Sequence, residues 1–204
     1  MRTIALTLAS SLVFVACSFV RDFEGFDTGA PDGSRPLDPP ADAGGDGGGA
    51  PSNLRPNGDF ESGCQGWRAF QGTIEPSAIV RGGKMACRVC PDETGFGNFS
   101  IGGSDPIVED PPPGSEYRVE AWFRKDPARP ALGSAGVLLR TSNADPFVEI
   151  EKRFSQVELV EEWRRGTTSL PVTQRAELLD ISLSGERASG GCFLVDDVAV
   201  VRVR

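Results

Sequence analysis

Apolar and polar residues alternate along much of the chain, with the two-residue period of β-strands. In EYRVEAWFR (116–124), one face of the predicted strand is apolar and the other carries Arg118, Glu120, Trp122 and Arg124. Further strands are expected within ranges of similar pattern: 82–90, 96–103, 135–142, 147–159, 161–172, 176–185 and 191–203. No long stretch has the 3.6-residue apolar period of a helix.

Runs rich in proline, glycine and aspartate separate these strands, as in DPPPGS, DPARPALGS and NADP. Short strands joined by regular turns are typical of antiparallel sandwiches. The pattern therefore predicts an all-β fold, an antiparallel β-sandwich or jelly roll, over residues 53–204.

The first 16 residues have the pattern of an export signal, with Arg2 followed by the apolar run IALTLASSLVFVA. The run ends in VFVAC, which resembles the lipobox of bacterial lipoproteins and would make Cys17 the acylated N-terminus, although Phe14 departs from the usual leucine. An ordinary signal cleaved near Ala16 is the alternative. By resemblance to lipoprotein sorting in Gram-negative bacteria, Ser18 favours the outer membrane over the inner one.

Residues 17–52 are rich in glycine, proline, aspartate and alanine, as in DTGAPDGSRPLDPPADAGGDGGGAPS. Such a composition cannot bury enough apolar surface to offset the entropy of ordering. We therefore predict a disordered tether that holds residues 53–204 away from the membrane. The chain has a formal net charge of −8 and no basic stripe, which argues against a nucleic-acid partner.

Four cysteines remain beside Cys17: Cys64, Cys87, Cys90 and Cys192. An even number in an exported chain predicts two disulfides. A redox C-x-x-C pair would need a helix N-terminus, and a four-cysteine zinc site would normally bring two close pairs. In a strand, positions 87 and 90 point to opposite faces, so they are not expected to bond to each other. Sequence does not fix the connectivity; Cys87–Cys192 with Cys64–Cys90 is the working assignment.

The chain contains no histidine, which excludes Ser-His-Asp and Cys-His catalysis and imidazole-ligated metals. A glycosidase needs only two acids across a cleft, but no acid here lies in a recognisable glycosidase motif. The sequence therefore predicts a protein that is not an enzyme, with a small hydrolase as an unsupported third possibility.

The motifs along residues 53–203 resemble, in their order, the carbohydrate-binding modules of families 4, 9 and 22 and the wider galactose-binding-like jelly rolls. They run NLRPNGDFESGCQGW, VRGGKMACRV, PPPGSEYRVEAWFR, VEEWRRGTTSLPV, AELLDISL and GCFLVDDVAV. The ordered set is more specific for the fold than for sugar binding, because many relatives serve as accessory or adhesion domains.

The resemblance implies a structural calcium ion, held by hard oxygen ligands. Motif matching assigns the carboxylates of Glu61 and Asp196 and the carbonyls of Asp59 and Lys84. The family often has a further acid before the Gly-Gly turn, where this chain has Arg81. The alternative interpretation of Glu61 and Asp196 is a pair of hydrogen-bonded turn acids.

The resemblance also implies a sheet face whose outward aromatics stack on sugar rings, with polar neighbours that bind hydroxyls. Trp122 is the predicted stacking residue, with Arg118, Glu120 and Arg124 beside it and Arg140 joining from the next strand. Burial of Trp122 under a loop is the alternative. The expected function is binding of a poly- or oligosaccharide at the cell surface, and the other hypothesis is a structural or adhesive domain without a sugar site.

Overall fold

The computed structural model describes residues 52–92, 97–130, 133–186 and 190–204. The predicted signal peptide (1–16), lipidation site Cys17 and nearly all of the tether (17–52) lie outside these residues. No helix in the described part is long and apolar enough to cross a bilayer. Its regular elements are strands: β1 (Trp67–Phe70), β2 (Gly72–Ser77), β3 (Ala86–Pro91), β4 (Asn98–Gly103), β5 (Val108–Glu109), β6 (Glu116–Lys125), β7 (Ser134–Asn143), β8 (Val148–Glu158), β9 (Arg164–Pro171), β10 (Leu178–Glu186) and β11 (Phe193–Arg202).

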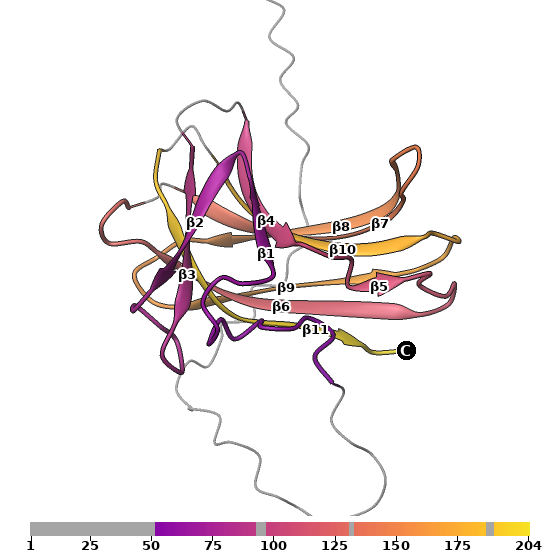
Figure 1. The fold of residues 1–204 in the computed structure, drawn as a ribbon, viewed down its shortest axis with the longest axis horizontal. Coiled ribbons are helices and arrows are strands. Elements are labelled where there is room, and N and C mark those ends of the chain that lie inside the picture. Colours follow the sequence, from indigo (N-terminus) through magenta and orange to yellow (C-terminus); the bar gives the residue numbers. More distant parts are fainter. Residues whose placement is uncertain (1–51, 93–96, 131–132, 187–189) are drawn as a thin grey trace, which may run out of the picture. The chain divides into compact units, whose positions relative to one another are not determined.

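The strands form two antiparallel sheets packed face to face, as Figure 1 shows. Sheet A has the order β1-β4-β10-β7-β8, and the short β5 pairs with β10. Sheet B has the order β2-β3-β11-β6-β9. Consecutive strands often lie in different sheets, which is the connectivity of a jelly roll. The predicted all-β sandwich is confirmed.

The core lies between the sheets and follows from the alternation in each strand. In β6, Tyr117, Val119, Ala121 and Phe123 are buried, and their neighbours point outward. Inward residues of β7 and β10 face them across the core: Val137, Leu139, Leu179, Ile181 and Leu183. The hydrophobic effect on these alternate positions therefore selects which face of each strand points inward.

Each strand range predicted from the sequence contains a strand, but three strands were not predicted. β1 and β2 are short, and Pro76 lies within β2. β5 has two residues. The predicted strand at 82–90 begins only at Ala86, because residues 82–85 form a turn in which Gly83 has a φ of 64°.

All four cysteines of the domain form disulfides, which confirms the predicted number and shows that Cys87 and Cys90 are not bonded to each other. The assigned pairing was wrong, because the bonds join Cys64 to Cys87 and Cys90 to Cys192. The register explains the second bond. β3 and β11 pair with Val89 opposite Phe193, so the next position on β3 meets the residue before β11. Cys87 bonds instead to Cys64, which lies in the turn that precedes β1.

Candidate functional site

The outer face of sheet A carries two hollows whose floor is largely serine and glycine, and we term the two together the trough. The register places Phe70, Ser100, Ser184 and Gly136 in one row across four strands. The adjacent row of outward positions contains Gly102, Ser182, Leu138 and Phe154. Serine and glycine leave the floor low between the aromatic side chains of the outermost strands. The trough crosses four strand spacings of about 4.8 Å, roughly 19 Å in all.

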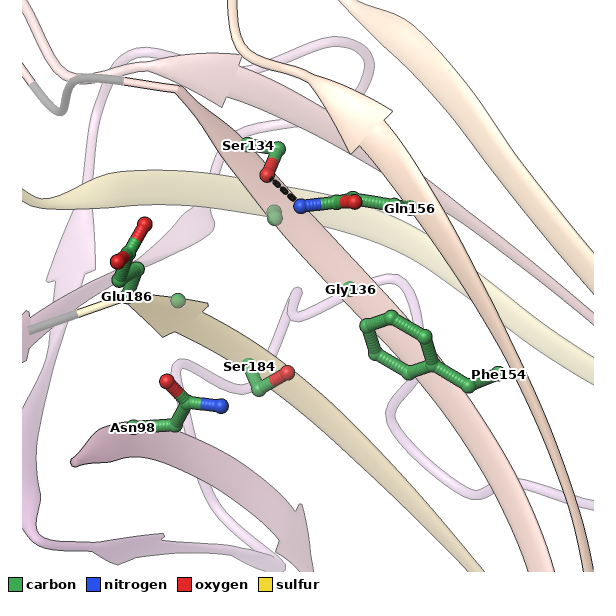
Figure 2. Close-up of a pocket in the computed structure, with 9 residues that line it drawn as sticks. Asn98, Ser134, Gly136, Phe154, Gln156, Ser184 and Glu186 are labelled. Atoms are coloured by element: carbon green, nitrogen blue, oxygen red, sulfur yellow. Dashed lines mark hydrogen bonds between the residues drawn. The ribbon is translucent and has the colours of Figure 1, made fainter. Parts of the chain in front are cut away.

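The first hollow of this trough has a volume of about 240 Å³ and is lined by Asn98, Ser134, Gly136, Phe154, Gln156, Ser184 and Glu186, among others (Figure 2). The Phe154 ring lies directly over Gly136, where a Cβ atom would come within 2.3 Å of the ring. Gly136 therefore permits the ring to lie against the sheet, while Phe154 stays 56% exposed. Gln156 donates a hydrogen bond to the Ser134 hydroxyl at the side of the hollow.

The second hollow lies beside the first on the same face, with a volume of about 280 Å³. Phe70, 64% exposed, lines it together with Ser182 and the charged pair Arg140 and Asp180. The Arg140 Nε atom lies 3.9 Å from the Asp180 carboxylate. Burial raises the pKa of Asp180, and the Arg140 charge opposes that rise. The pair presents a donor and an acceptor side by side.

These groups suit a neutral ligand that is rich in hydroxyl groups. Serine hydroxyls donate and accept hydrogen bonds, the carboxylate accepts and the guanidinium donates. Exposed phenylalanine rings offer flat apolar surfaces at separate points along the trough. The length of the trough fits a ligand of several linked units better than a single small molecule.

The predicted ligand face of β6 lies on the other sheet, and three of its side chains, Arg118, Glu120 and Trp122, already contact charged neighbours. Trp122 is half-buried, and the Arg81 guanidinium lies 3.9 Å from its ring centroid. Glu120 lies 3.4 Å from Arg118 and 3.7 Å from Arg165. Arg124 is half-buried on the same face. The Arg81 guanidinium therefore covers one face of the Trp122 ring, and sugar binding by Trp122 stays a prediction.

Arg140 does not join Trp122, and this part of the prediction was wrong. β7 follows β6 in the chain but crosses to sheet A, so the two side chains point away from opposite sides of the sandwich. Arg140 instead lines the second hollow of the trough. The expectation failed because adjacency in sequence was taken for adjacency in a sheet.

The predicted calcium ligands meet at a turn between β2 and β3, which we term the clasp (Arg81–Met85 with Glu61 and Asp196). The fully buried Asp196 accepts hydrogen bonds through Oδ2 from the backbone N–H groups of Arg81 at 2.8 Å and Gly82 at 3.4 Å. Glu61 Oε1 accepts from the N–H groups of Lys84 at 2.7 Å and Met85 at 3.3 Å. The two carboxylates thus bind opposite ends of one turn.

This donor set fits the hydrogen-bonded alternative better than a calcium shell. Ca²⁺ takes 6–8 oxygen ligands, whereas Arg81, Gly82, Lys84 and Met85 direct N–H groups at the two carboxylates. Asp59 uses its carboxylate to accept from the Glu61 N–H. Across the described ranges, no group of three or more histidine, cysteine, aspartate or glutamate residues could hold a metal ion. Calcium binding stays a prediction, to be tested by the melting experiment below.

Sequence reasoning missed Phe70, Phe154 and the serine and glycine floor of the trough. The signal was present, because Ser100 and Gly102 alternate with apolar residues in β4 and Ser182 and Ser184 do so in β10. Outward positions are usually larger and charged, so repeated small residues on one face indicate a depression. Only the strand order shows that these positions are neighbours.

No protein-family model and no curated protein matches the chain. Solved structures do match: a family 16 carbohydrate-binding module, at 16% identity and a TM-score of 0.55, covers 73% of this chain and 99% of its own. The CBM22-1 xylan-binding domain of Paenibacillus barcinonensis Xyn10C has 13% identity and a TM-score of 0.56, with coverage of 76% and 97%.

The enzymatically active domain of tailspike protein 4 from bacteriophage CBA120 has 12% identity and a TM-score of 0.57; the match covers 74% of this chain but only 21% of the tailspike chain. A family 4 module also matches, with a TM-score of 0.51. At such low identity these matches establish the fold alone. The resemblance inferred from the motifs is confirmed at that level: this chain carries a carbohydrate-binding-module-like jelly-roll domain.

Proposed function

We propose that the domain binds a poly- or oligosaccharide along the trough on sheet A and performs no catalysis on it. The observation that carries this proposal is the register of the outer face, which sets exposed Phe70 and Phe154 around a floor of serine and glycine. A sugar ring has an apolar C–H face and a rim of hydroxyl groups. The trough offers complementary surfaces for both.

The comparisons support the ligand class. Several of the matching structures are named as carbohydrate-binding modules, and two of them are named as xylan-binding domains. Other matches belong to enzymes. The match covers 21% of the tailspike chain, 24% of an arabinofuranosidase chain and 27% of a xylanase 10B chain. The absence of histidine is consistent with a binding role for this chain.

A glycan array followed by affinity electrophoresis tests the proposal. Wild-type protein should be retarded by a subset of glycans, and the double variant Phe70→Ala/Phe154→Ala should not. Trp122→Ala, on the opposite sheet, should be retarded like the wild type. Loss of retardation in Trp122→Ala alone would move the site to sheet B, and no binding by the wild type across the array would favour the structural or adhesive alternative.

We further propose that the domain is exported and anchored by lipid at Cys17, with residues 17–52 as the tether. The support is the sequence alone: the apolar run before VFVAC, the four domain cysteines and the acidic, proline- and glycine-rich stretch. Ser18 favours the outer membrane of a Gram-negative bacterium. Labelling with a fatty-acid analogue, compared between wild type and Cys17→Ser, tests the anchor. An unlabelled wild type would refute it.

A further inference from the structure

The Arg81 side chain links two outward groups of sheet B. Its guanidinium lies 3.9 Å from the ring centroid of Trp122 and forms an ion pair with Asp197. Its own backbone N–H binds Asp196. The same segment is held from a third side, because Trp163 donates its indole N–H to the Val80 carbonyl at 3.1 Å.

Two adjacent acids, Asp196 and Asp197, are bound by groups of this segment. Asp196 has no exposed surface, and a buried carboxylate is costly unless it is hydrogen-bonded or paired. It receives N–H groups from Arg81, Gly82 and Asp197. Asp197 adds a second negative charge beside it, and that charge is met by the Arg81 guanidinium.

We propose that Arg81 is the built-in cation of the clasp, so that the turn closes over sheet B without a metal ion. The guanidinium neutralises Asp197 while its stacking on Trp122 fixes its position. Backbone N–H groups satisfy Asp196 and Glu61 at the two ends of the turn. Because Arg81 is itself a residue of that turn, its positive charge cannot dissociate as a bound metal ion can.

A divalent cation at the same place would have to displace these interactions. It would compete with three N–H groups at Asp196 and two at Glu61, and it would lie close to a guanidinium of like charge. Gly83 packs closely against Glu61, because a Cβ atom there would lie 2.0 Å from Glu61 Oε1. The clasp is therefore already closed by the atoms of the chain itself.

Thermal unfolding of the full chain tests this proposal in two independent ways. First, the wild-type Tm should be the same in EDTA and in millimolar Ca²⁺, whereas a ligand that binds the native state raises Tm. Second, Arg81→Gln should lower Tm by several degrees, because Asp197 loses its cation and Trp122 its stacking partner.

Arg118→Gln is the matched control, because Arg118 is also an arginine on the outer face of sheet B and its partner Glu120 keeps Arg165. Its Tm should stay close to that of the wild type. A wild-type Tm that rises with Ca²⁺ and falls in EDTA would overturn the proposal and establish the calcium site. Equal melting of Arg81→Gln and Arg118→Gln would also overturn it. The comparison of wild-type Tm in EDTA and in Ca²⁺ needs no variant, so it remains a valid test even if Arg81→Gln does not fold.

Discussion

Truncation of Phe154 to alanine is the sharpest perturbation of the trough. The ring lies on Gly136 at one end of the first hollow and is more exposed than buried. Its removal should leave the core unchanged, because Phe154 belongs to the outer face of β8. The variant should therefore fold like the wild type but lose a stacking surface.

The expected size of the effect follows from the exposed area of the ring. Phe154 is 56% exposed, and with roughly 200 Å² for a phenylalanine side chain, about 110 Å² is free for a ligand. A sugar on one face covers about half of that area, which at about 25 cal/mol/Å² contributes about 1.4 kcal/mol. This free energy corresponds to about a tenfold increase in Kd.

Isothermal titration calorimetry with a glycan selected on the array measures this change directly. The matched control is Met85→Ala, which removes a 39% exposed apolar side chain that lines neither hollow. Circular dichroism should show that both variants keep the wild-type fold. A Kd for Phe154→Ala equal to that of the control would refute the assignment of the trough as the sugar site.

Three further predictions concern other parts of the domain. Gly136→Ala should weaken glycan binding with little change in Tm, because the added Cβ displaces the exposed Phe154 ring rather than core atoms; calorimetry and melting on the same sample test both halves, and unchanged binding would contradict it. The double variant Cys90→Ala/Cys192→Ala opens a loop of 102 residues and should lose stability by about 4–5 kcal/mol in urea unfolding, while a loss near zero would count against the chain-entropy account. Burial raises the pKa of Asp180 above its ordinary 3.8, so the native state holds this proton more tightly than the unfolded chain does. The free energy of unfolding should therefore fall as pH rises from below 3.8 through the raised native pKa. Urea unfolding should show a smaller fall with pH for Asp180→Asn, and the same pH dependence in variant and wild type would be inconsistent with this cause.

The fold class followed from the sequence because alternation is a local property. In β6, each buried residue is recognisable from its two neighbours, and the same holds for β10. β2 gave no such signal, because its burial pattern is irregular and Pro76 interrupts it. That strand exists because β3 pairs with it along six residues, a contact that local pattern does not encode.

The candidate site could not be predicted, because it depends on the order of strands within a sheet. Trp122 was the reasonable choice by residue type, and its outward direction was confirmed. Its covering partner Arg81 is 41 positions earlier in the sequence, and nothing local marks the contact. The predicted disulfide pairing was wrong for the same reason, because β3 and β11 become neighbours only in the folded sheet.

The two ends of the domain meet on sheet B. Leu54 donates its backbone N–H to the Val200 carbonyl, and the Asn53 side chain bonds the backbone of Val198 and Val200 in β11. A fusion partner joined at either end would thus leave from the layer opposite the trough, and neither attachment would obstruct a long polymer crossing sheet A. Adjacent ends also suit insertion of the whole domain into a surface loop of another protein. If the trough binds glycan as proposed, the domain could be attached through either end with its binding face still directed away from the attachment point.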